Sequence, residues 1–206
     1  MHRQTLFRIG LAVWGLAVAA GFVVLMEYQN GPGPQADAPS DWPDDVRQAP
    51  APDQYTLVAF AHPHCPCTDA TMGELARLMR HVRDRLAVHV YFTQPAGFSD
   101  EWTRSGLWQK AAAIPGVTPH RDPEASVADQ FGAYTSGQVL LYDPKERLVF
   151  NGGITGSRGH EGNNKGRQAV TEWVRTGQAE RATTFVFGCL LRAEGEMESY
   201  PPASGS

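Results

Sequence analysis

Cysteine is scarce in this chain of 206 residues, which contains only Cys65, Cys67 and Cys189. Three cysteines are too few for a disulfide scaffold of the kind that holds small secreted domains together. Positive charge is not in excess either, since 22 acidic residues outnumber 18 basic ones and the formal net charge is -4. Because nucleic-acid-binding proteins carry a basic surface, no nucleic-acid partner is expected.

Two specific site types are also missing. The glycine-rich segment 152–162 lacks the Gly-Lys-Ser/Thr ending of a phosphate-binding loop. Its glycines are expected to permit close backbone approach or positive φ angles. The close cysteine pair lacks the spacing of structural zinc sites, which place two to four residues between cysteines.

Charged and strongly polar side chains are absent from residues 9–26. A helix of this length spans roughly 27 Å, close to the thickness of a hydrocarbon core. Arg3 and Arg8 precede the segment and Glu27 follows it, so the N-terminus is expected in the cytoplasm and the remainder outside.

A cleaved signal peptide is the alternative for this N-terminal segment. Such a peptide has a shorter apolar region that ends in a small-x-small cleavage site. Here the triplet Ala17-Val18-Ala19 lies inside the apolar run and is followed by the apolar residues 22–26. An uncleaved signal-anchor over residues 1–29 is therefore favoured.

The composition divides the rest of the chain into three parts. Residues 30–53 are rich in Pro, Gly, Ala and Asp and are expected to form an extended tether, with Trp42 as a candidate contact to the domain. Residues 54–191 are expected to fold as one domain, and residues 192–206 to form a tail.

The domain sequence alternates between strand and helix patterns. Its first apolar run, 56–61, predicts a central strand buried on both faces. An amphipathic helix follows, starting near Cys67 or Thr68, or at the Thr71–Glu74 capping-box pattern. Further elements are expected as a strand at 86–92, helices within 103–114 and 125–131, a β-hairpin of 138–142 and 147–150, and a helix at 167–175. This order indicates an α/β fold, a mixed sheet between helices.

The most informative motif is His62-Pro63-His64-Cys65-Pro66-Cys67-Thr68, at the junction of the first strand and helix. Cysteine attacks as the thiolate, and a helix N-terminus stabilises negative charge. A protonated His64 beside Cys65 would lower the pKa of that thiol further. The motif therefore predicts thiol–disulfide chemistry without a cofactor.

Metal binding is the alternative use of the same residues. His62, His64, Cys65 and Cys67 could offer imidazole and thiolate ligands to copper or zinc, with His160 or Cys189 completing the site. A non-catalytic scaffold is a third class, for which replacing the cysteines would have no consequence in the cell.

Longer motifs carry a resemblance to the thioredoxin-like superfamily. The distance from Cys65 to Leu75 is similar to that in the CPPCRAEMPEL-type motifs of membrane-anchored TlpA/ResA-type proteins. The segments LVAFAHPHCPCT, FGAYTSGQVLLYD, LVFNGGITGSRGHEGNNKG and FGCLL resemble the RedB-like group, over residues 42–191. The resemblance implies a thioredoxin-like fold with a central mixed sheet. It also implies a thiol–disulfide oxidoreductase in the bacterial inner membrane, with its domain in the periplasm and protein thiols or disulfides as clients.

The resemblance assigns roles to the cysteines and also shows departures. It makes Cys65 the exposed attacking thiol and Cys67 the thiol that resolves the mixed disulfide. Thr68 stands at the usual second-cysteine position, and His64 replaces the usual tryptophan. The segment 136–138 lacks the family's cis-proline, which packs against the cysteines and helps hold the substrate, and this leaves room for a metal or another ligand. A Cys65–Cys67 disulfide across a proline would be strained and labile.

Two further parts of the chain are candidates for the site. Two reversals in the hairpin return the chain to the cysteine end of the sheet, so the loop with Arg158 and His160 is expected over Cys65 and Cys67. There Arg158 would stabilise a thiolate, and His160 would shuttle protons or bind a metal. Cys189 is expected to be either a buried structural thiol or a resolving, relay cysteine.

Overall fold

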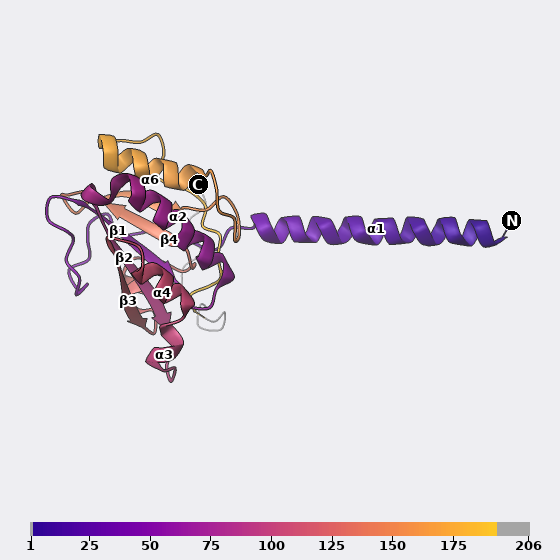
Figure 1. The fold of residues 1–206 in the computed structure, drawn as a ribbon, viewed down its shortest axis with the longest axis horizontal. Helices are drawn as coiled ribbons and strands as arrows, with labels where there is room; N and C mark the ends of the chain where they lie inside the picture. The colour runs from indigo at the N-terminus through magenta and orange to yellow at the C-terminus, as the bar shows by residue number, and fades with distance from the viewer. Residues whose placement is uncertain (1, 193–206) are drawn as a thin grey trace. The chain divides into compact units, whose positions relative to one another are not determined.

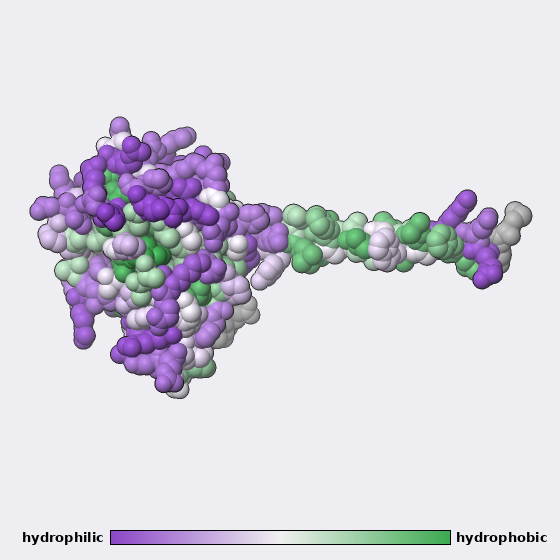
Figure 2. All heavy atoms as spheres, viewed as in Figure 1, coloured by the Kyte–Doolittle hydropathy of each residue, from purple (hydrophilic) through white to green (hydrophobic). Residues whose placement is uncertain are grey.

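The computed structural model describes residues 2–192, and the chain divides into two compact units, Met1–Gly31 and Pro32–Ser206. The first unit is the single helix α1 (His2–Asn30). Its stretch Arg3–Asn30 is long and apolar enough to cross a membrane, by length and composition. Apolar side chains lie along the middle of this helix on the face that Figure 2 shows, as its sequence predicts.

The second unit is built on a five-stranded mixed sheet with the order β3-β2-β1-β4-β5. β1 pairs in parallel with β2 and β2 with β3, whereas β4 runs antiparallel to β1 and β5 antiparallel to β4. The strand bounds are β1 Tyr55–Ala61, β2 Leu86–Gln94, β3 Val117–Pro123, β4 Gln138–Tyr142 and β5 Leu148–Gly153. This is the thioredoxin-like α/β arrangement, and the predicted fold class is confirmed.

Helices cover both faces of the sheet. Two of them, α2 and α6, pack side by side on one face, where α4 also lies (Figure 1). The short α5 packs on the opposite face. The helix bounds are α2 Pro66–Val82, α3 Asp100–Thr103, α4 Gly106–Ala112, α5 Ser126–Gln130 and α6 Lys165–Thr176, with a 3-10 turn at Arg83–Arg85.

The central strand β1 is buried along its whole length. Because successive side chains of a strand point to opposite faces, Leu57 and Ala59 join the core under α2 and α6. Val58 and Phe60 join the second core, on the other face. Burial on both faces explains why this strand is a continuous apolar run.

The segment 30–53, predicted to be a tether, is placed differently by the structure, because its residues from Pro32 onward belong to the domain unit. Trp42 is buried, its ring packs edge-on against Phe131 and Tyr142, and its amide donates to the Glu146 carbonyl (3.0 Å). The short α5 leaves part of this apolar face for the segment to cover. Of the predicted tail 192–206, all but Arg192 lies outside the described residues.

Candidate functional site

Cys65 occupies the N-cap of α2, immediately after β1 and a short turn. Its backbone is extended (φ −83°, ψ 119°), and Pro66 begins the helix. Proline favours this position because its missing N–H would be unpaired there in any case. The Cys65 side chain therefore stands at the positive end of the helix dipole. The helix begins at Pro66, next to the predicted start at Cys67, and the alternative predicted start at Thr71 is wrong.

Cys65 is in contact with Cys189, its Sγ lying 2.8 Å from the Cys189 Sγ. The expectation of an exposed Cys65 is wrong, since the residue is only 1% exposed. The reason is that the chain around Cys189 covers it. Cys189 itself is half-buried, so it is not a thiol enclosed in the core. The structure thus brings together two cysteines that are 124 positions apart.

The surroundings of the three thiols shift their pKa values in different directions. Burial would raise the pKa of Cys65, but hydrogen-bonding interactions with Cys189 and Thr68 outweigh burial and lower it from its ordinary value. Burial, together with the nearby Cys65, raises the pKa of Cys67. Burial and the interaction with Cys65 raise the pKa of Cys189 to about 12. Their surroundings therefore make Cys65 the most acidic of the three thiols, and it lies in hydrogen-bonding contact with Cys189.

The loop between β5 and α6 returns to the cysteines as predicted. The two antiparallel pairings place the C-terminal ends of β1 and β5 at the same end of the sheet. Arg158 donates from Nη1 to the carbonyl of Gly188, and its positive charge favours the thiolates of Cys67 and Cys189. His160 is exposed, and its backbone amide donates to the backbone carbonyl of Ser157 (3.2 Å). The structure brings Arg158, but not the His160 ring, into contact with the thiol site.

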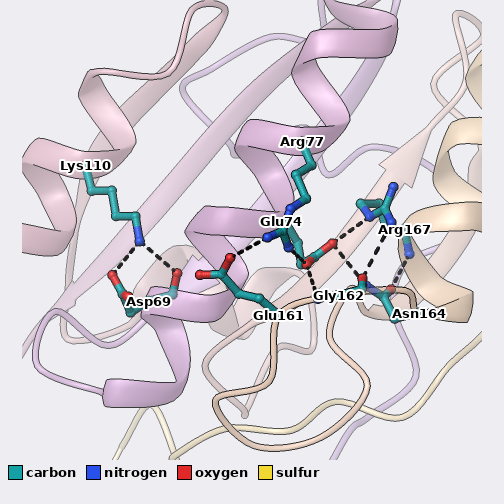
Figure 3. Close-up of polar contacts among 8 residues, drawn as sticks. All are labelled: Asp69, Glu74, Arg77, Lys110, Glu161, Gly162, Asn164 and Arg167. Atoms are coloured by element: carbon teal, nitrogen blue, oxygen red, sulfur yellow. Dashed lines mark hydrogen bonds and ion pairs between the residues drawn. The ribbon is translucent and has the colours of Figure 1, made fainter.

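A buried carboxylate ties this loop to α2 (Figure 3). The side chain of Glu74 is fully buried and accepts hydrogen bonds from the Gly162 amide (2.7 Å), Asn164 Nδ2 (3.1 Å) and Arg167 Nε (2.5 Å). Arg77 forms a further ion pair with it. Sequence reasoning interpreted Glu74 as part of a capping box and missed this role.

The two histidines of the motif pack against Trp102, which sequence reasoning also missed. His64 Nε2 lies 3.0 Å from the Trp102 carbonyl oxygen, and the two rings are 4.7 Å apart. The half-buried His62 packs edge-on against the same indole, at 5.6 Å. Burial, with a smaller effect of His64, lowers the pKa of His62. Its Nδ1 accepts from the His64 amide (3.2 Å), so its ring is held in place.

Thr68, which interacts with Cys65, is also in contact with Ser136. Their hydroxyl oxygens lie 2.6 Å apart, and Ser136 Oγ also accepts from the His62 amide (2.8 Å). Thr68 is the residue predicted to replace the second cysteine, and Ser136 belongs to the segment 136–138 that was predicted to lack the cis-proline. No peptide bond among the described residues is cis. The hydroxyl pair thus joins the start of α2 to the chain that enters β4.

The donor set of the metal alternative is not assembled. Within residues 2–192 there is no group of three or more His, Cys, Asp or Glu side chains that could hold a metal ion. His62 and His64 are turned to Trp102, and His160 is exposed. The histidines of the predicted donor set therefore do not converge on the cysteines in this arrangement.

No protein-family model and no curated protein matches the chain. Among solved structures it is similar to a hypothetical protein from Sinorhizobium meliloti 1021, with 22% identity, a TM-score of 0.55 and coverage of 79% of this chain and 96% of that one. It is similar to a conserved protein from Geobacillus kaustophilus, with 17% identity, a TM-score of 0.55 and coverage of 81% and 90%. An exposed lipoprotein thioredoxin from Streptococcus pneumoniae matches at 13% identity, a TM-score of 0.43 and coverage of 60% and 84%. By its strand order, the chain has the thioredoxin-like fold.

Proposed function

We propose that this chain is a membrane-anchored thiol–disulfide oxidoreductase of the periplasm, in the TlpA/ResA-type branch and closest to the RedB-like group. The observation that carries the proposal is the contact of the Cys65 thiol, at the N-cap of α2, with a second thiol (2.8 Å). A thiolate at a helix N-terminus beside a second cysteine has the two parts that disulfide exchange requires.

The residues around Cys65 have defined roles in this exchange. The Cys65 thiolate attacks a disulfide of a client protein, and a second thiol of the site then attacks the resulting mixed disulfide. Thr68 stabilises the thiolate of Cys65, and Arg158 favours the thiolate of Cys67 or Cys189 when either becomes the attacking group. The reaction needs no cofactor, because the electrons move between sulfur atoms.

Redox titration of the full-length chain in detergent tests the proposed exchange. The protein is equilibrated in glutathione buffers from cytosolic to periplasmic poise, alkylated and weighed by mass spectrometry. We expect two of the three cysteines to lose alkylation together across this range. Three thiols that stay free at every poise would contradict the exchange function.

Metal analysis of the same preparation tests the copper alternative. Protein purified under reducing conditions is expected to carry no stoichiometric copper or zinc, because the histidines do not converge on the cysteines. Stoichiometric metal that disappears in the double variant Cys65→Ser/Cys67→Ser would support a metallochaperone instead.

A phosphatase fusion tests the orientation. Alkaline phosphatase folds only where disulfides form, so a fusion after Gly31, at the end of the helical unit, is expected to be active in a bacterial host. A fusion after Arg8 lacks the apolar segment and is expected to be inactive. An inactive Gly31 fusion that is expressed as strongly as the Arg8 fusion would refute the proposed topology.

A further inference from the structure

The C-terminal segment that carries Cys189 is held against the thiol site by backbone hydrogen bonds. The Ser136 amide donates to the Cys189 carbonyl (2.8 Å), and the Leu191 amide donates to the Tyr134 carbonyl (2.9 Å). A single antiparallel bridge, between Thr135 and Leu190, lies between them. These contacts fix the backbone at Cys189 and at the residues that follow it.

The residue before Cys189 is fixed as tightly. A Cβ atom at Gly188 would lie 1.8 Å from the carbonyl oxygen of Ser136, so only glycine permits this approach. The Gly188 carbonyl accepts a hydrogen bond from Arg158. The segment is thus fitted to its place, and the Cys189 side chain is directed at Cys65.

We infer that Cys189 is the resolving thiol of Cys65, so that the redox-active disulfide joins Cys65 to Cys189 and not to Cys67. This inference rests on the proposed exchange function and names the second cysteine of its cycle. A disulfide needs its sulfur atoms about 2.0 Å apart, and the two thiols are already at 2.8 Å. The two sulfur atoms would have to approach by less than about 1 Å to form the bond.

Cys67 is less well placed for that bond. It is the second residue of α2, and its side chain interacts with that of Cys65, but the sulfur atom in contact with the Cys65 Sγ at 2.8 Å is that of Cys189. Pro66 between them has a fixed φ angle, which restricts any turn that would bring the two sulfur atoms together. Arg158 interacts with both Cys67 and Cys189, so its charge does not favour one of them as the partner of Cys65.

The cycle balances with a client disulfide as the only other reactant. The Cys65 thiolate attacks one sulfur of the client, a mixed disulfide forms, and the first client thiolate leaves. The Cys189 thiol then loses its proton and attacks the Cys65 sulfur. The Cys65–Cys189 bond forms, the second client thiolate leaves, and the client is reduced while the two cysteines are oxidised. The reverse sequence oxidises a client dithiol.

Peptide mapping of the oxidised, full-length chain tests the inference. Trypsin releases Cys65 and Cys67 together in peptide 48–77, and Cys189 in peptide 182–192. After oxidation with glutathione disulfide and alkylation in detergent, we expect these two peptides to be linked and to carry one alkyl group. The linkage is expected to persist in Cys67→Ser and to fall to background in Cys65→Ser and in Cys189→Ser.

Two other results would overturn the inference while leaving the exchange function intact. One is a disulfide within peptide 48–77 together with an alkylated Cys189. The other is a linkage that survives Cys65→Ser and vanishes in Cys67→Ser, which would pair Cys67 with Cys189. If no cysteine oxidises at any glutathione poise, the proposed exchange function itself fails.

Discussion

Replacing Cys65 with serine is expected to reduce catalysed disulfide exchange to the uncatalysed rate, a loss of about a thousandfold or more. A serine hydroxyl does not ionise near neutral pH and does not attack a disulfide. In the structure, Cys65 is the cysteine at the N-cap of α2, and interactions with Cys189 and Thr68 lower its pKa. No other described thiol has both features.

The pH dependence of alkylation identifies the same residue. Because the thiolate is the reactive form and the pKa of Cys65 is lowered, alkylation of Cys65 by iodoacetamide in the reduced protein is expected to have its midpoint at a lower pH than that of an ordinary cysteine. Cys189, whose pKa is raised to about 12, is expected to react last. In Cys189→Ala the interaction with Cys65 is lost, so the midpoint of Cys65 is expected to move to higher pH.

Cys67→Ser is the matched control for the activity measurement, because it removes the neighbouring thiol of the same motif. Exchange of a model peptide disulfide is measured for both variants in detergent, with circular dichroism as a check on folding. An equal loss in both variants would show that the nucleophile is not Cys65 alone. A Cys65→Ser protein that retains most of its activity would contradict the assignment altogether.

The local parts of this fold could be predicted from the sequence because their signals are local. The continuous apolar run ending at Ala61 is buried on both faces, as β1. The predicted hairpin is β4 and β5, and its two reversals carry the loop with Arg158 to the cysteines. Pattern and position along one stretch of chain were sufficient in each case.

The contacts that complete the site are not local, so the sequence pattern does not reveal them. Cys189 meets Cys65 across 124 positions, and a single cysteine after the last helix carries no signal of its partner. Trp102 lies in a four-residue helix whose sequence says nothing of the histidines that pack on it. The sequence did draw attention to the segment 136–138, but not to the contact of Ser136 with Thr68.

The segment before the domain shows how composition can mislead. Proline and glycine predict an extended chain, and residues 32–53 contain no regular helix or strand. Composition does not indicate whether such an extended chain packs on the sheet. Here it does, and Trp42 is buried in the apolar core on the α5 face. Individual residues such as Trp42 and Val46, and not the average composition of the segment, join it to the core.

The role of Glu74 also depends on contacts that are distant in the sequence. Replacing Glu74 is expected to have a large effect on stability. Glu74→Ala is expected to lower the free energy of unfolding of the domain by about 3 kcal/mol, since removing one partner of a buried ion pair leaves the other charge uncompensated. The Glu74 carboxylate is fully buried, and the Arg167 side chain that pairs with it is only 18% exposed (Figure 3). In a domain of this size the change corresponds to a fall in Tm of roughly 6–12 °C.

Glu161→Ala is the matched control for this effect. Glu161 also pairs with Arg77, at 2.9 Å, but its side chain is 36% exposed. Exposed ion pairs contribute about 1 kcal/mol or less, so the control is expected to shift Tm by no more than a few degrees. Thermal unfolding of the reduced proteins in detergent compares the two variants. Equal shifts in Tm would show that the buried position of Glu74 gives it no special effect. A larger shift in Glu74→Ala would show that this buried carboxylate of α2 stabilises the packing of the Arg158 loop.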